Sequence, residues 1–585
     1  MIQPTIRRTT LAAIATAAMM VGHTVKAQSP EDLKLQREAY DAVEAKSVVA
    51  LQPFRHEMQA SDTQSGLLID LINLNPAINA WFVLQLRPEE DAKPVSYHLE
   101  NPHPQSQTLG LAEGNAAITI TTGSKTISCA PWQADGQDLI TAQETGLAYA
   151  SICDGALLLR NRVTGARTNI EATAEFLRDN VWGGESIVRF VRDNFFKDSE
   201  LETSDTLGAG GHAADRTGPP AMLGNKAPEE MPVISTLLDI GLEDTERGRM
   251  TVGQWYPVAD MTGIFASAFQ PRRIAKEVLE GPGKTNWIDN VEGKATGYMV
   301  AFDLSQFDMG FAMGTDHPAM GWSPRPPASV RPRGLPGPDG IKTAKPLVLL
   351  GMVNKEIANK TVATFTAGFK RSHGAFKYGD MAGFNLGHHY GFIEKGVILS
   401  KLQPNLSTLF GLTDGSIHMK TWTEEDNALL PQISFARQNG VPLVETDPET
   451  GLATVGDRVT KWGPGNWSGS ANAELRTLRA GGCMVQKDET QYLLYGYFSS
   501  ATPSAMARTF QAYGCNYAML LDMNALEHTY MALYVPREGQ IHVQHMVPGM
   551  ALVDKKARNG TVIPRFIGFA DNRDLFYVTR KEPQK

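Results

Sequence analysis

The sequence predicts a mixed α/β (α+β) protein, in which a β-rich N-terminal region precedes a C-terminal domain with a twisted mixed sheet and helices. Short apolar or alternating runs, separated by turn residues, recur through residues 66–160 and are typical of strands. A strand, a helix and a second strand follow one another between residues 492 and 521. Apolar residues make up 42% of the chain and charged residues 20%, a composition that supports a packed core.

The length of 585 residues indicates several domains, at roughly 100–200 residues per domain. We expect an N-terminal β-rich region with helices at residues 28–206 and the C-terminal domain at residues 255–585. The stretch from Leu207 to Pro232 is rich in Gly, Pro and Ala, which is typical of a linker or a long loop. We therefore assign residues 207–254 to a connection between the two regions.

The first 27 residues have the pattern of a signal peptide. Arg7 and Arg8 precede an apolar run from Leu11 to Gly22, and the segment ends at Ala27, as in a cleavable export sequence. The apolar run is shorter than the about 20 residues of a membrane-spanning helix. A general secretory signal fits, and the paired arginines leave twin-arginine export as the alternative. We expect a secreted protein of the bacterial periplasm, with no transmembrane segment in the mature chain.

The charge balance argues against a basic nucleic-acid-binding protein. The formal net charge is −8, and no block of Lys and Arg could follow a phosphate backbone. Removing residues 1–27 takes away Arg7, Arg8 and Lys26 and no acidic residue, so the mature chain carries −8 − 3 = −11. We therefore expect no nucleic-acid partner.

The chain has four cysteines, Cys129, Cys153, Cys483 and Cys515. An even number in an oxidising compartment favours disulfides, and three pairings are possible. We expect Cys129–Cys153 and Cys483–Cys515, because each pair lies within one local block; a catalytic thiol is the alternative. The sequence contains no CxxC and no HExxH motif, so it indicates no metal and no cofactor.

The C-terminal domain contains a predicted strand–helix–strand unit. The strands are Tyr492–Phe498 and Tyr517–Leu521, and Thr502 and Pro503 are a typical N-cap and first residue of the helix between them. Three apolar side chains share one face of this helix, which Gly514 ends: Met506, Phe510 and Tyr513. We expect parallel strands with a right-handed crossover.

Asp522 follows the second strand directly. A carboxylate at this place is costly unless it is solvated, paired or used, and open α/β sheets bind ligands at the carboxyl ends of their strands. If the chain stays extended, Asn524 points the same way as Asp522. The alternative is an aspartate that only forms the turn after the strand.

A second candidate segment follows a predicted strand from Thr361 to Thr366. Glycines flank a group that includes Lys370 and His373, which indicates a tight loop that presents cationic and proton-transferring side chains to an anionic substrate. The alternative is a purely structural histidine.

A third candidate is the pair Arg437 and Asn439, which share a face if the chain is extended. Arginine can hold a phosphate or carboxylate with two hydrogen bonds, and asparagine can bind a sugar hydroxyl. The alternative is an arginine that ties a loop to the backbone.

Four segments, taken in order, resemble the phosphodiester glycosidase family. They are residues 363–374, 391–399, 436–443 and 514–524, and the resemblance covers roughly residues 255–580. The family's Asn-Gly-Gly-Phe is here Thr366-Ala367-Gly368-Phe369, and Asp522 precedes Met523 and Asn524 in place of glycines. Both departures resemble a divergent bacterial branch.

The resemblance implies a phosphodiester-glycosidase-like domain at residues 255–585 and hydrolysis of a glycosidic bond at a sugar-1-phosphodiester or a related envelope glycan linkage. Asp522 would be the carboxylate and His373 the proton-transfer residue. The implied substrate-binding residues are Lys370 and Arg437 for the anionic leaving group, and Asn439 and Asn524 for the sugar. The alternative is a non-catalytic saccharide-binding or polysaccharide-assembly protein on the same fold.

The signal-like start generates a first prediction. N-terminal sequencing of the native protein should find Gln28 at or near the mature end, because Ala27 has the small side chain that cleavage requires. An intact Met1 on a cytoplasmic protein would contradict export and would remove the redox argument for the disulfides.

Overall fold

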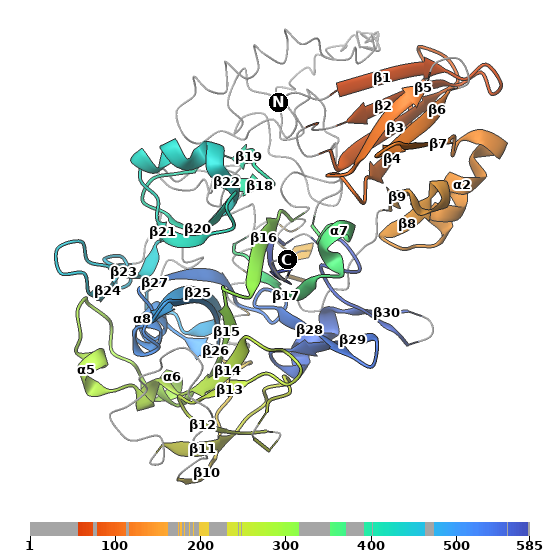
Figure 1. Ribbon diagram of the computed structural model, residues 1–585. Helices are drawn as coiled ribbons and strands as arrows, with labels where there is room; N and C mark the ends of the chain where they lie inside the picture. Colours follow the sequence, from red (N-terminus) through yellow and green to blue (C-terminus); the bar gives the residue numbers. More distant parts are fainter. Residues whose placement is uncertain are drawn as a thin grey trace, which may run out of the picture.

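The computed structural model describes residues 56–73, 79–112, 116–161, 198–209, 231–243, 248–314, 351–369, 391–400, 402–461, 473–557, 560–571 and 573–582, with a few isolated residues between these ranges. Within them the protein is a mixed but strand-dominated structure of several antiparallel sheets and a few helices (Figure 1). The predicted fold class is therefore confirmed, including the β-rich N-terminal region.

The N-terminal region contains two antiparallel sheets. The larger has the order β1-β2-β3-β4-β9-β8 and the smaller β5-β6-β7 (orange, Figure 1). Their bounds are β1 His56–Ser61, β2 Leu68–Asn73, β3 Trp81–Arg87, β4 Val95–Glu100, β5 Gln107–Ala112, β6 Ala117–Thr122, β7 Lys125–Cys129, β8 Tyr149–Ile152 and β9 Leu157–Arg160, with helix α2 at Gln133–Glu144. Strand β3 is buried on both faces: Phe82 and Leu84 join the local core, whereas Trp81 and Val83 join the main core.

The described part of the segment that we expected to be a linker forms a third sheet. Strands β10 (Thr206–Ala209), β11 (Pro232–Ser235) and β12 (Arg249–Thr251) pair in this order. Ile234 and Met250 are buried in the main core, because apolar side chains in this Gly/Pro-rich stretch gain by leaving water. The division of the chain at residues 207 and 254 stays a prediction.

The main core is built around an eight-stranded sheet of order β13-β14-β15-β26-β25-β27-β23-β24. Its strands are β13 Trp255–Pro257, β14 Ile264–Phe269, β15 Gly297–Asp303, β23 Pro442–Thr446, β24 Ala453–Val455, β25 Thr477–Lys487, β26 Thr490–Ala501 and β27 Tyr517–Met523. All neighbouring strands are antiparallel.

The predicted strand–helix–strand unit is present, with one difference. Both β26 and β27 pair antiparallel with β25, so they run parallel to each other but have β25 between them. The helix therefore crosses over one intervening strand. A local sequence pattern identifies the two strands and the helix, whereas the neighbour that each strand selects depends on residues outside the unit.

Helix α8 (Pro503–Ala512) begins and ends as predicted. The Thr502 hydroxyl accepts a hydrogen bond from the backbone N–H of Ala505 at 3.2 Å, and Gly514 follows the helix with φ +76°. The helix packs against β25 at Gly481, where a Cβ atom would lie 2.9 Å from side-chain atoms of α8. The glycine thus allows the apolar face of α8 to approach the sheet.

Two five-stranded antiparallel sheets complete the C-terminal part. The first has the order β16-β32-β17-β28-β29, and the second β19-β18-β22-β20-β21 (teal, Figure 1). Their bounds are β16 Phe307–Ala312, β17 Thr361–Thr366, β18 Phe392–Glu394, β19 Val397–Ser400, β20 Ser407–Leu412, β21 Ile417–Thr421, β22 Ile433–Gln438, β28 Met531–Arg537, β29 Gln540–His545 and β32 Leu575–Arg580. Further short elements are the helices α5 Lys276–Leu279, α6 Asn290–Lys294 and α7 Lys355–Ala358, and the strands β30 Lys555–Lys556 and β31 Val562–Ile563, which pair as a two-stranded sheet.

Both predicted disulfides are formed. Cys129 bonds Cys153, 24 residues later, and Cys483 bonds Cys515, 32 residues later. The second bond links β25 to the turn between α8 and β27, inside the eight-stranded sheet. In the described part of the chain, no helix has the length and apolar character needed to cross a membrane.

The Cys483–Cys515 bond generates a prediction for stability. Replacing both cysteines by alanine should lower the free energy of unfolding by about 3–4 kcal/mol, because the bond closes a loop of 32 residues in the unfolded chain. Urea titration measures the change. The matched control is the Cys129→Ala/Cys153→Ala variant, which removes the disulfide of the N-terminal region instead. Peptide mapping without reduction that links Cys483 to Cys129 would contradict the pairing.

Candidate functional site

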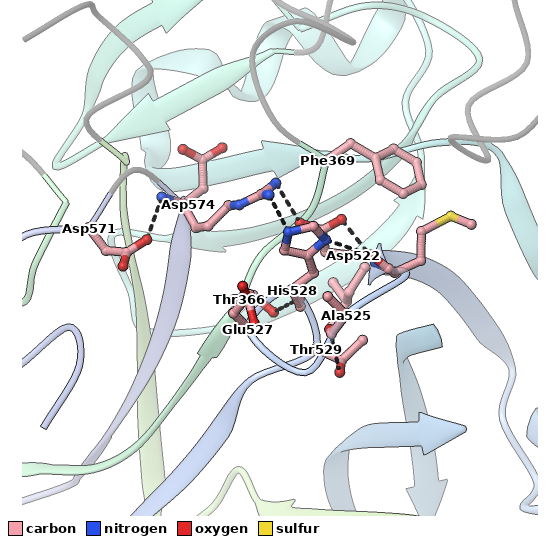
Figure 2. Close-up of polar contacts among 12 residues, drawn as sticks. Thr366, Phe369, Asp522, Ala525, Glu527, His528, Thr529, Asp571 and Asp574 are labelled. Carbon is pink, nitrogen blue, oxygen red and sulfur yellow. Dashed lines mark hydrogen bonds and ion pairs between the residues drawn. The ribbon is translucent and has the colours of Figure 1, made fainter. Parts of the chain in front are cut away.

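Asp522 is the penultimate residue of β27 and is only 4% exposed. Its Oδ2 lies 3.1 Å from the guanidinium Nη1 of Arg573, and its Oδ1 accepts the backbone N–H of Met523 at 2.9 Å (Figure 2). The carboxylate is thus paired with a cation and oriented by its own backbone. A buried charge at this edge of the sheet is held in one position.

The same arginine connects Asp522 to His528. Arg573 Nη2 lies against His528 Nε2, and His528 Nδ1 donates to the carbonyl of Met523 at 2.8 Å (Figure 2). Because a carbonyl only accepts, Nδ1 carries the ring proton and Nε2 accepts from the guanidinium. These two contacts fit the tautomer that carries its proton on Nδ1.

The backbone around His528 is held by a tight turn and by β17. His528 and Thr529 both donate their backbone N–H to the carbonyl of Ala525, at 3.0 Å each, and the Thr366 hydroxyl donates to the carbonyl of His528. The turn therefore sets the histidine between the ends of β17 and β27.

A second ion pair, between Arg565 and Asp571, contacts the backbone of Arg573. Its backbone N–H donates to Asp571 Oδ1 at 3.0 Å, and Arg565 binds both carboxylate oxygens of Asp571, at 2.9 and 3.0 Å. Burial opposes ionisation, but the charge and hydrogen bonds of Arg565 leave the pKa of Asp571 below its usual value. Acidic and basic groups thus alternate through the interior, so that each charge has a counter-charge.

Arg437 is fully buried and pairs with Asp574. The Arg437 Nε lies 2.9 Å from Asp574 Oδ2, with the two side chains 0% and 1% exposed. Asp574 Oδ1 accepts the backbone N–H of Gly314 at 2.7 Å. Arg437 also donates to the backbone carbonyls of Gln438 and Phe369, and its guanidinium carbon lies 4.6 Å from the centroid of the Phe392 ring.

Arg437 and Asn439 together hold the turn after β17. Arg437 Nη2 donates to the Phe369 carbonyl at 2.8 Å, and Asn439 Oδ1 accepts the Phe369 N–H at 3.0 Å. Gly368 has φ +155°, and a Cβ atom there would lie 2.6 Å from the Asn439 side chain. Asn439 Nδ2 also donates to the carbonyls of Leu520 and Leu521, at 3.0 and 2.9 Å. The turn is thereby tied to β27 beside Asp522.

The structure brings Asp522, Arg437 and Asn439 into one connected region. Asn524 differs: β27 ends at Met523, and Asn524 has φ +81°. The extended chain that would align Asn524 with Asp522 is therefore interrupted, and its Oδ1 accepts from the Thr477 hydroxyl at 3.1 Å. Lys370 and His373 lie outside the described residues, so their roles stay predictions.

The sequence analysis missed four residues of this region, which are His528, Asp571, Arg573 and Asp574. Two signals were available. A histidine follows the Asp522 strand within a short polar turn, and three charged residues gather at positions 571–574 directly before a strand. Among the described residues, no group of three or more His, Cys, Asp or Glu is arranged to hold a metal ion.

Glu394, at the end of β18, adds a titratable group near this region. It is 3% exposed, and its Oε2 accepts the backbone N–H of Met313 at 3.0 Å. Burial raises the pKa of the Glu394 carboxyl to about 7, and the negative charge of Asp574 contributes in the same direction. Glu394 therefore changes its charge near neutral pH.

Comparisons with known proteins find only weak similarity to solved structures. No family model and no curated protein match the chain. Among solved structures, the zebrafish N-acetylglucosamine-1-phosphodiester alpha-N-acetylglucosaminidase catalytic domain, auto-inhibited by its pro-peptide, is similar at 10% identity and a TM-score of 0.28, over 55% of this chain and 85% of that chain. A Synechocystis protein is similar at 10% identity and a TM-score of 0.27, over 91% of this chain and all of that chain.

Glu394 generates a prediction for the pH dependence of stability. Its pKa is higher in the folded state, about 7, than its ordinary value of 4.5, so the folded protein binds more protons between these values and its stability falls as pH rises through them. Glu394→Gln removes this loss. The stability of the variant relative to the wild type, from urea titrations, should increase by roughly 2–3 kcal/mol between pH 5 and pH 8.

Glu424→Gln is the matched control, because Glu424 is exposed. Its stability relative to the wild type should be the same at both pH values. An equal effect of both substitutions at pH 5 and pH 8 would show that the Glu394 carboxyl does not titrate in this range.

Proposed function

We propose that this protein is an exported hydrolase that cleaves a glycosidic bond at a sugar-1-phosphodiester or a related linkage of an envelope glycan. The observation that carries the proposal is the Asp522 carboxylate, held by Arg573 and connected through it to His528 at the carboxyl end of β27. Glycosidic bond cleavage requires a fixed carboxylate.

In this proposal Asp522 acts on the anomeric carbon, where positive charge develops in the transition state. The contacts with Arg573 and with the Met523 N–H hold the carboxylate in one orientation, which a nucleophile or charge-stabilising group needs. His373 would transfer the proton to the leaving oxygen. His528 would be a positioning residue, since its ring accepts from Arg573 and donates to the Met523 backbone.

The leaving group in this proposal is anionic, and Lys370 and Arg437 would supply positive charge for it. Arg437 binds the backbone carbonyl of Phe369. Its positive charge would therefore act on the leaving group from beneath the turn at Phe369. Asn524 would orient the sugar, whereas the buried Asn439 would act indirectly, by fixing the Phe369 backbone N–H.

We further propose that the protein works in the bacterial periplasm. The two disulfides are compatible with an oxidising compartment, and the signal-like segment at residues 1–27 favours export.

The alternative function is non-catalytic saccharide binding or polysaccharide assembly. The observation that favours it is that the buried aspartates and arginines of the site are paired with each other. Asp522 and Arg573 have side-chain exposures of 5% and 4%, and Arg437 and Asp574 of 0% and 1%. Buried pairs of this kind also serve a purely structural role.

Asp522→Asn should separate the two functions. The variant keeps the shape of the side chain and removes its charge, so hydrolysis of a sugar-1-phosphodiester that the wild type cleaves should fall by about 10²–10⁴-fold. Because the ion pair with Arg573 is buried, the variant should also lose about 1–3 kcal/mol of stability. Turnover is therefore compared at a temperature at which circular dichroism shows both proteins folded.

Asp303→Asn is the matched control. Asp303 is also a buried aspartate at a strand end of the eight-stranded sheet, but it caps a turn through Ser305 and Gln306. Its replacement should leave turnover unchanged. Full activity of Asp522→Asn would contradict the catalytic assignment, and a wild type that binds glycans but cleaves no sugar-1-phosphodiester or purified envelope glycan would favour the alternative.

A further inference from the structure

A pocket of about 410 Å³ lies at the other end of β27 from Asp522. It is formed where β21, at the edge of its five-stranded sheet, meets β23, β25 and β27 of the eight-stranded sheet. Tyr517 lines it at the first residue of β27, whereas Asp522 lies five positions further along the strand. At about 3.3 Å per residue, the two sites are roughly 16 Å apart.

One part of the lining, which we call the floor, is apolar and firmly built. It contains Met419 and Met484, which are 8% and 6% exposed and belong to the main core. The Tyr517 hydroxyl forms hydrogen bonds with Thr421 Oγ1 at 2.8 Å and with Ser407 Oγ at 3.0 Å. This floor keeps its shape without a ligand, because its side chains are fixed by packing and hydrogen bonds.

The rim of the pocket carries side chains that both donate and accept hydrogen bonds. The amides of Gln486, Gln491 and Asn516 lie on the ends of β25 and β26 and directly before β27. An amide offers two N–H donors and a carbonyl acceptor, and one of these donors of Gln486 binds the Asp488 carbonyl at 2.8 Å. Such groups match a ligand whose hydroxyls also donate and accept.

The charged residues around the pocket give it no excess of positive charge. Its lining contains one acidic side chain, Glu445, and one lysine, Lys420. The Lys420 ammonium is paired with Asp426 at 2.8 Å. The pocket therefore lacks the concentrated charge that would select a phosphate or a carboxylate.

We propose that this pocket is a binding site for an uncharged sugar unit. An apolar floor contacts the C–H face of a sugar ring, and a rim of amide groups binds its hydroxyls, as in small-molecule sites that combine apolar walls with a few polar groups. The volume lies within the usual range for such sites, about 300–1,000 Å³. Binding here requires no hydrolysis at Asp522, so the inference stands independently of the proposed activity.

The test uses the purified mature chain and three probes: glucose, N-acetylglucosamine and glucose 1-phosphate. Saturation-transfer NMR and calorimetry should detect binding of at least one uncharged sugar. Gln486→Trp fills the rim from an exposed strand position, where a tryptophan is well tolerated, and should weaken this binding by at least 10-fold. Asn516→Ala should weaken it by about 5-fold, because it removes one amide.

The matched control is Gln540→Trp, the same substitution at an exposed position of β29, and it should leave binding unchanged. Asp522→Asn should also leave binding at this pocket unchanged while hydrolysis falls, so failure of one proposal is distinguishable from failure of the other. The inference is overturned if neither uncharged sugar binds, if glucose 1-phosphate alone binds, or if Gln486→Trp binds as the wild type does.

Discussion

The buried ion pair between Arg437 and Asp574 is the interaction on which the region around Asp522 depends. Arg437 belongs to β22 of one five-stranded sheet, and Asp574 directly precedes β32 of the other. Through Phe369 and Asn439 the pair is connected to β27 of the eight-stranded sheet. Three sheets therefore meet at one charge pair. Because removing one partner of a buried pair costs more than the pair contributes, the three strand ends are tied to each other.

The interior of this region tolerates many ionisable groups because they are arranged as alternating charges. Asp522, Arg573, Asp571 and Arg565 form a continuous series of charged contacts and backbone hydrogen bonds. In such a series the electric field of each group is largely cancelled by its neighbours, and the desolvation cost is offset. Glu394 is the exception, since its burial outweighs the nearby positive charges of Lys395 and Arg160 and raises its pKa to about 7. Its charge therefore changes near neutral pH.

Local rules of sequence predicted the parts of the structure that local interactions determine. The cap at Thr502, the end of α8 at Gly514 and both disulfides follow from residues near one another in the chain. The partners of Asp522 could not be predicted in this way, because Arg573 is 51 residues away and no periodic pattern relates the two. The position of β25 between β26 and β27 was missed for the same reason. At Asn524, a single residue with positive φ reversed the expectation of an extended chain.

The order of strands β26-β25-β27 has a consequence for the assembly of the protein. Strands β25 and β26 form a long hairpin across a short turn, and β27 joins it after only one helix. Contacts between residues close in sequence form quickly, because little loop entropy is lost when they meet. The edge that carries Asp522 is therefore expected to be shaped early during folding. Its counter-charges come from distant segments, so an unpaired carboxylate is present until the last strand, β32, is in place.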